Sequence, residues 1–99
     1  MNLKALVTSV TSAFFMYFVY ILYSSLRDKY YIGYTSDLVL RVIKHNSRHK
    51  GFTQGVKDWK IVFTEQFQNK QEAMLREQQI KSWKNRRLIE ILIQSRSDG

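Results

Sequence analysis

The stretch Phe18–Gly33, with the sequence FVYILYSSLRDKYYIG, decides the fold. Its first part, Phe18–Ser24, is rich in aromatic and β-branched residues, which is the composition of a β-strand. A polar break at residues 25–29 separates it from a second strand-like run at residues 30–35. So short a connection favours an antiparallel hairpin.

A helix is expected directly after the hairpin. Ser36 or Asp37 is a favourable helix cap, and the helix should run to about Ser47. The loop that follows, residues 48–58, contains two glycines among basic and polar residues. The helix residues expected to face inward are Leu38, Val39, Val42 and Ile43.

Residues 59–67 predict a third strand, because apolar and polar residues alternate there. Asn69, with an acid three residues later, predicts a helix to about Trp83, and Asn85 predicts the cap of a last helix. The order β-β-α-β-α-α gives an α+β domain, a three-stranded antiparallel sheet flanked by helices. The strand residues expected on one buried face are Trp59, Ile61, Phe63 and Phe67.

The composition limits the class of protein. The chain has 99 residues, enough for one small domain, and 44% hydrophobic and 14% aromatic residues can fill its core. Sixteen Lys and Arg against eight Asp and Glu give a net charge of +8, which favours nucleic acid or an anionic membrane as partner. The absence of cysteine excludes disulfides, cysteine metal sites and a cysteine nucleophile.

The amino-terminal segment is uncharged from residue 5 to residue 23, as in a signal peptide or membrane anchor. Polar residues dilute this run, and residues 17–23 are needed for the first strand. We therefore interpret residues 1–15 as an extension, with Met16 as the natural start and a domain over residues 16–95. We expect a cytoplasmic protein without a membrane partner. Amino-terminal sequencing from the native host tests this, and a chain beginning at Met1 would contradict it.

Four residues of the hairpin and the first helix are candidates for chemistry. Tyr20 and Tyr31 would approach each other across paired strands, although a phenol is a poor base without a nearby cation, and strand tyrosines often only pack. Arg41 and His45 lie one helical turn apart. Arginine can grip a phosphate and histidine can shuttle a proton, whereas the alternative is a solvated basic face.

Glu77 is the candidate metal ligand. It falls on the stripe formed by Ala73, Ile80 and Trp83, and an inward carboxylate costs free energy unless it is paired or metal-bound. A single carboxylate suits Mg²⁺ or Mn²⁺, since Mg²⁺ keeps most of its waters and binds substrate phosphate as well. The alternative is a buried ion pair with Arg41.

Further basic residues are candidates for contacts to the nucleic-acid backbone that carry no sequence information. A charge run is also typical of a soluble surface. The candidates are Lys44, Arg48, Lys50, Lys81, Lys84, Arg86 and Arg87.

Together these residues resemble the GIY-YIG nuclease family, in particular its small stand-alone bacterial members. Phe18-Val19-Tyr20 stands at the first motif, with Phe18 replacing its glycine, and Tyr31-Ile32-Gly33 matches the second. Arg41, ten residues after Tyr31, and Glu77 fall where the family places its arginine and its metal-binding glutamate. His45 stands where members carry His or Tyr. The similarity covers residues 17 to about 93.

The resemblance implies a metal-dependent DNA endonuclease on a mixed α/β fold, with no small-molecule cofactor. Glu77 would hold Mg²⁺ or Mn²⁺, and Tyr20, helped by Tyr31 or His45, would accept a proton from the attacking water. Arg41 would stabilise the transition state, and Gly33 would leave room for Tyr31 and its neighbours. Without a separate DNA-reading domain, we expect structure-selective or weakly specific cutting, in repair or recombination.

Two other functions remain open on the sequence. One is a basic nucleic-acid-binding module whose nuclease site is idle, which would bind DNA without cutting it. The other is a membrane-tethered protein anchored by residues 1–23, which cell fractionation would detect.

Overall fold

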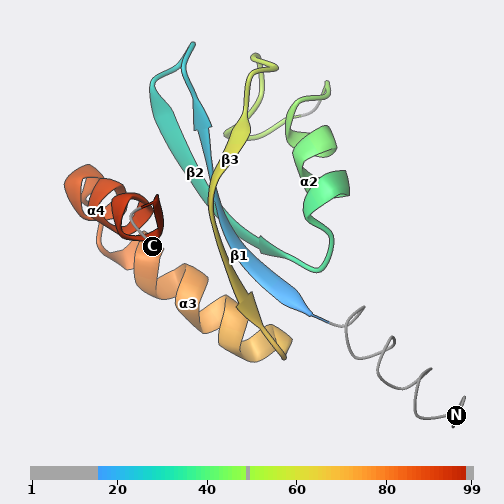
Figure 1. The fold of residues 1–99 in the computed structure, drawn as a ribbon. Helices are drawn as coiled ribbons and strands as arrows, with labels where there is room; N and C mark the ends of the chain where they lie inside the picture. The colour runs from blue at the N-terminus through green and yellow to red at the C-terminus, as the bar shows by residue number, and fades with distance from the viewer. Residues whose placement is uncertain (1–15, 49, 98–99) are drawn as a thin grey trace, which may run out of the picture.

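The computed structural model describes residues 16–48 and 50–97, so the predicted extension at residues 1–15 lies outside the described residues. The predicted order β-β-α-β-α-α is confirmed (Figure 1). The elements are β1 (Tyr17–Ser24), β2 (Lys29–Thr35), α2 (Leu38–His45), β3 (Lys60–Phe67), α3 (Lys70–Ser82) and α4 (Arg86–Ser97). Within the described ranges, no helix is long and apolar enough to cross a membrane.

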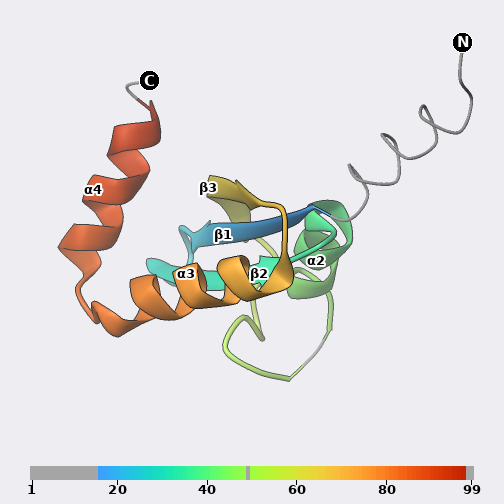
Figure 2. The ribbon, with the colours of Figure 1, turned by 90° about the horizontal axis from the view of Figure 1, so that it is seen from below.

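The three strands form an antiparallel sheet in the order β2-β1-β3. The predicted hairpin is confirmed, and its register places Tyr20 opposite Gly33 and Leu22 opposite Tyr31. The central position of β1 explains its burial, because both of its edges are paired and both of its faces are covered. Helices α3 and α4 lie on one side of the sheet and α2 on the other (Figures 1 and 2).

Each face of the sheet has its own apolar cluster. The cluster on the side of α3 and α4 is built around Val19, Ile21, Ile32, Phe63, Ala73 and Ile80. The cluster on the side of α2 is smaller and consists of Tyr20, Leu22 and Trp59, with Tyr31, Leu38, Val42 and Val56 packed against it. Alternate residues of β1 therefore serve opposite clusters, as strand geometry requires.

The predicted single buried face at residues 59–67 is wrong. Ile61 pairs with Leu22 and Phe63 pairs with Ile21, so the register shifts by one residue between them. Such a β-bulge reverses the side on which later residues fall. Trp59, just before β3, consequently packs on the α2 side and Phe63 on the α3 side, while Ile61 is exposed.

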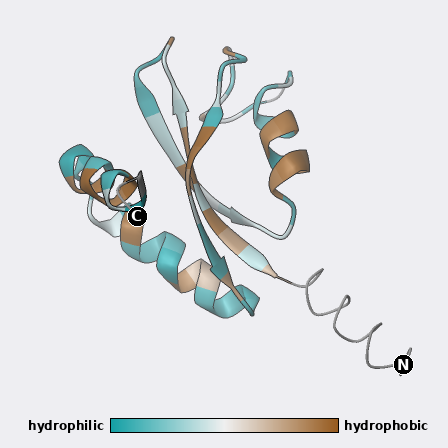
Figure 3. Ribbon diagram, in the orientation of Figure 1, coloured by the Kyte–Doolittle hydropathy of each residue, from teal (hydrophilic) through white to brown (hydrophobic). Residues whose placement is uncertain are grey.

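Helix α2 is shorter than predicted, ending at His45, and Asp37 is its cap, accepting a hydrogen bond from the Leu40 backbone nitrogen at 3.0 Å. Only its edge meets the sheet, through Leu38, Val42 and His45. The prediction that Val39 and Ile43 face inward is wrong, because these side chains are 70% and 59% exposed. The outer surface of α2 is therefore apolar (Figure 3).

The caps predicted for the last two helices are confirmed. The Asn69 side chain accepts a hydrogen bond from the backbone nitrogen of Glu72 at 2.9 Å. The Asn85 side chain accepts one from the backbone nitrogen of Leu88 at 3.2 Å. Helix α3 therefore begins next to the end of β3, and α4 begins after a short turn in which Lys84 has a φ of 47°.

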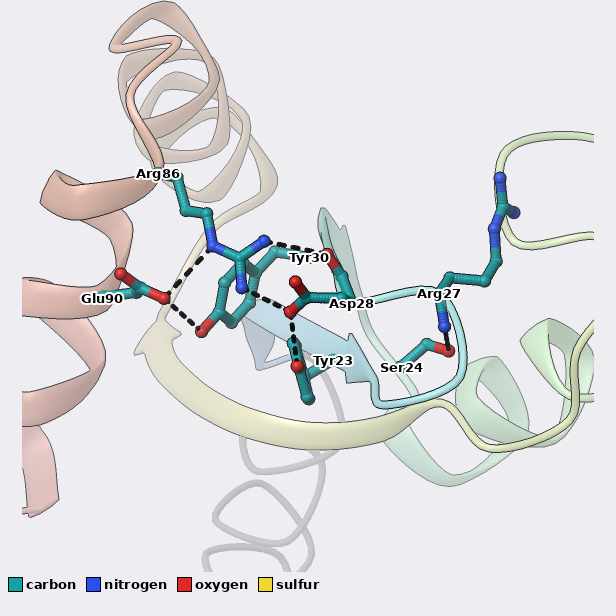
Figure 4. Close-up of polar contacts among 7 residues, drawn as sticks. All are labelled: Tyr23, Ser24, Arg27, Asp28, Tyr30, Arg86 and Glu90. Carbon is teal, nitrogen blue, oxygen red and sulfur yellow. Dashed lines mark hydrogen bonds and ion pairs between the residues drawn. The ribbon is translucent and has the colours of Figure 1, made fainter.

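A polar network ties α4 to the turn between β1 and β2 (Figure 4). The Arg86 guanidinium bonds the Asp28 carboxylate at 2.6 Å and the Glu90 carboxylate at 3.2 Å, and lies over the Tyr30 ring at 5.1 Å. Tyr23 and Arg86 hydrogen-bond Asp28, and both interactions hold the pKa of that carboxyl below its ordinary value. The network fixes the start of α4 against the hairpin.

Candidate active site

An open cleft of about 460 Å³ lies at the edge strand β2 and is lined by residues of α2 and α3 as well as of the sheet. Four of the five predicted catalytic residues line it, each from a different element. They are Tyr20 from β1, Tyr31 from β2, Arg41 from α2 and Glu77 from α3. Residues far apart in the sequence are thus brought to one surface.

His45, the fifth predicted residue, lies beneath the cleft and is 8% exposed. Its Nε2 is 2.9 Å from the Tyr20 hydroxyl oxygen, and its Nδ1 is 2.8 Å from Thr53 Oγ1. The His45 and Tyr31 rings are 4.6 Å apart, and the two tyrosine rings 6.2 Å apart. When Nδ1 donates to Thr53, Nε2 carries the lone pair that accepts the Tyr20 proton.

The protonation of Tyr20 depends on its surroundings. Burial raises the pKa of Tyr20 above its ordinary value, and neighbouring Tyr31 raises it further. The Arg41 guanidinium opposes this by lowering the pKa of Tyr20, whereas the Glu77 carboxylate raises it. At neutral pH the phenol is therefore protonated and can release its proton only with help from an acceptor or a cation.

Gly33 makes room for the side chains of both Tyr20 and Tyr31. A Cβ at Gly33 would lie 2.5 Å from the Tyr20 hydroxyl oxygen, 2.7 Å from Tyr20 Cζ and 3.0 Å from Tyr31 Cε1. The register explains this, because Gly33 sits directly opposite Tyr20 on the edge strand. The missing side chain lets the phenol reach the cleft.

If the site cleaves nucleic acid, as the resemblance implies, we expect Gly33→Ala to lower the rate by about 10²-fold, since misplacing a catalytic group by about 1 Å has a cost of that order. The added methyl group requires the Tyr20 hydroxyl to shift, which disturbs its 2.9 Å contact with His45. Cleavage should be compared in single-turnover assays. In a Tyr20→Phe background the same substitution should change little, because the hydroxyl is already gone. An unchanged rate for Gly33→Ala alone would contradict this role.

Arg41 and Glu77 face the cleft without forming the buried ion pair that was the alternative prediction. Within residues 16–48 and 50–97, the Arg41 guanidinium forms no hydrogen bond or ion pair with protein. The Glu77 carboxylate lies 3.3 Å from Lys81 Nζ, one helical turn along α3, and its side chain is 14% exposed. Both charges therefore remain available to a ligand in the cleft.

A metal ion in the cleft would have few protein ligands. No group of three or more His, Cys, Asp or Glu side chains that could hold a metal occurs among the described residues. Mg²⁺ binds commonly through one or two carboxylates, several waters and substrate phosphate. Glu77, at the cleft wall, could supply one such oxygen ligand.

The predicted backbone-binding residues fall in three places. Lys44 and Lys50 line a smaller hollow beside the cleft, and Arg48 is exposed just after α2. Lys81 pairs with Glu77. Lys84 is exposed in the turn before α4, and Arg87 is exposed at the start of α4. Arg86 differs from the others, because its guanidinium is held by Asp28 and Glu90.

Sequence reasoning missed several residues of the site. Lys70 lines the cleft and stands seven residues before Glu77, so helical periodicity could have identified it. Thr53, the partner of His45, lies in a loop and left no signal in the pattern. The other lining residues that were missed are Tyr17, Tyr34, Thr35 and Ser36.

Comparison with known proteins identifies the family. Residues 16–90 match the GIY-YIG catalytic domain of the GIY-YIG family. The chain belongs to the GIY-YIG family. It is a member of a nuclease family, and its natural class of substrate is nucleic acid.

The similar proteins are small, as this one is. The UPF0213 protein VNG_2274C of Halobacterium salinarum is 40% identical over 67 residues, 67% of this chain and 86% of that protein. The UPF0213 protein SSP2268 of Staphylococcus saprophyticus is 32% identical over a match that covers 63% of this chain and 77% of that protein. A similar solved structure is the solution NMR structure of the UPF0213 protein BH0048 of Bacillus halodurans. The two sequences are 31% identical, the TM-score is 0.51, and the match covers 80% of this chain and 83% of that one.

Proposed function

We propose that this protein is a divalent-metal-dependent endonuclease that hydrolyses DNA phosphodiester bonds. The observation that carries the proposal is the convergence of Tyr20, Arg41 and Glu77 from three elements on one open cleft. A phenol, a cation and a carboxylate are what phosphodiester hydrolysis needs for deprotonating water, binding the phosphate and holding the metal. The net charge of +8 favours the same polyanionic substrate.

Each residue has one task in the proposed reaction. Glu77 would hold Mg²⁺ or Mn²⁺, which would supply Lewis-acid polarisation of the scissile phosphate. Arg41 would bind the phosphate oxygens and stabilise the charge that grows on them, since its guanidinium has no protein partner within the described residues. Lys70 would add a second positive charge at the same cleft.

Tyr20 and His45 would move the proton. The attacking water would lose a proton to the Tyr20 oxygen as the phenol proton passes to His45 Nε2, 2.9 Å away. This relay suits a phenol whose pKa is raised by burial, because Tyr20 then need not exist as a free phenolate. Thr53 would hold the His45 ring in position through Nδ1.

The proposal is tested with labelled duplex, single-stranded, nicked and branched DNAs in Mg²⁺, Mn²⁺ or EDTA. We expect cleavage with either metal and none in EDTA. We propose that cutting follows the structure of the DNA more than its sequence, as in repair or recombination. DNA bound without cleavage in any metal would instead establish the idle nucleic-acid-binding module.

A further inference from the structure

Phe52, beside the catalytic cleft, is an exposed aromatic ring on a firmly held backbone. The ring is 49% exposed, yet the next residue, Thr53, is only 1% exposed and contacts His45. The Arg27 guanidinium donates to the backbone carbonyls of Phe52 and Gln54, and the Trp59 indole donates to that of Thr53 at 3.0 Å. These bonds fix the backbone of residues 52–54 at the point where the Phe52 side chain is exposed.

The ring borders a hollow that adjoins the catalytic cleft. This hollow has a volume of about 170 Å³, below the roughly 300–1,000 Å³ of a site for a drug-sized ligand. Tyr31 and Arg41 line both the hollow and the cleft, so a group bound in the hollow would lie next to a phosphate bound in the cleft. The remaining walls are formed by Lys44, His45, Lys50, Gly51, Phe52 and Thr53.

The charges around Phe52 suit a polyanion. Arg27 Cζ lies 5.4 Å and Lys29 Nζ 5.9 Å from the ring centroid, while Lys44 and Lys50 stand on the side of the hollow. On the other side, Phe52 borders a groove of about 610 Å³ that contains Lys29 and Lys84. Asp28 also lines this groove, but Arg86 neutralises its carboxylate.

We propose that Phe52, with the Tyr31 ring beside it at a centroid distance of 6.0 Å, forms an open stacking slot for one unpaired DNA base next to the bond that is cut. Aromatic rings flanked by basic residues bind single-stranded nucleic acid by stacking bases and holding the backbone. A base within a duplex would first have to leave its stack, which costs free energy. For an unpaired base this free-energy cost is smallest. The slot rests on the proposed function. It predicts that the substrate is DNA with an unpaired nucleotide at the point of cleavage.

Binding is tested in EDTA, so that no cleavage occurs, with a short single-stranded oligonucleotide that contains 2-aminopurine. Stacking on Phe52 should change the 2-aminopurine fluorescence relative to free oligonucleotide. We expect Phe52→Ala and Phe52→Leu to weaken binding by about 5- to 150-fold, the usual range for removing a stacked aromatic, and Phe52→Trp to retain it. Phe52→Leu keeps an apolar side chain at this position, so its melting temperature should remain close to that of the wild type.

Leu26→Ala is the matched control, since Leu26 is an exposed apolar residue of the hairpin turn, 75% exposed, and lines neither hollow nor cleft. Its binding should equal that of the wild type. Binding by Phe52→Leu as tight as by the wild type, or 2-aminopurine fluorescence unchanged on binding, would overturn the slot.

Cleavage gives the second readout. Wild-type protein should cut a duplex with one unpaired nucleotide faster than the fully paired duplex, and this ratio should fall toward one in Phe52→Leu. A wild type that cuts both substrates equally would overturn the slot but leave the endonuclease standing. Phe52-dependent binding without cleavage of any DNA would support the slot and overturn the endonuclease.

Discussion

Glu77→Gln should lower metal-dependent DNA cleavage by about 10³-fold or more, because removing one carboxylate charge removes the proposed metal ligand. A metal that polarises phosphate supplies several kcal/mol, and each 1.36 kcal/mol corresponds to tenfold in rate. Glutamine keeps the shape of the side chain, and the partly exposed Glu77–Lys81 pair contributes little to folding. Single-turnover rates, with melting temperatures measured in parallel, separate loss of chemistry from loss of fold.

The control is Glu72→Gln, which removes the same charge from the exposed first turn of the same helix. Its cleavage rate should stay within a few fold of the wild type. Mn²⁺ binding, followed by electron paramagnetic resonance without DNA, should weaken in Glu77→Gln and not in Glu72→Gln. A Glu77→Gln protein that binds Mn²⁺ and cuts DNA as the wild type does would assign the metal to another ligand.

The sequence predicts the hairpin, the element order and four residues of the cleft because each depends on local pattern. Strand composition, helix caps at Asn69 and Asn85, and the spacing from Tyr31 to Arg41 are all short-range signals. The inward position of Glu77 is likewise readable from helical periodicity. The hairpin, the helix caps and the inward position of Glu77 are fixed by residues close together in the chain, whereas the spacing from Tyr31 to Arg41 is informative through its resemblance to the family motif.

The features that the sequence does not reveal depend on contacts between distant segments. The bulge opposite Ile21 and Leu22 arises from how β3 meets β1, and it moves Trp59 and Phe63 to opposite faces. The exposure of Val39 and Ile43 follows from how little of the short helix α2 touches the sheet. The Thr53–His45 bond requires the loop after α2 to fold back onto the end of that helix, and no pattern within the loop indicates it.

Arg41→Ala should lower the rate of cleavage at saturating DNA by about 10²- to 10³-fold, the usual loss when one donor to a transition-state oxyanion is removed. Arg41→Lys should recover only part of this rate, since an ammonium is a point charge without the bidentate guanidinium geometry. Folding should be unaffected, because within the described part of the chain Arg41 makes no ion pair that the substitution could break. DNA affinity in EDTA should fall by less than about tenfold, since the residue acts mainly on the transition state.

The pH dependence of Arg41→Ala provides a check that a purely structural role would not produce. The Arg41 cation lowers the pKa of Tyr20, so its removal raises that pKa and makes the phenol proton harder to release. The pH at which activity is highest should therefore lie higher in Arg41→Ala than in the wild type. Lys60→Ala removes one exposed positive charge from the strand at the opposite edge of the sheet and should alter neither rate nor pH profile. An Arg41→Ala protein with the wild-type pH profile and rate would show that Arg41 acts on neither Tyr20 nor the phosphate.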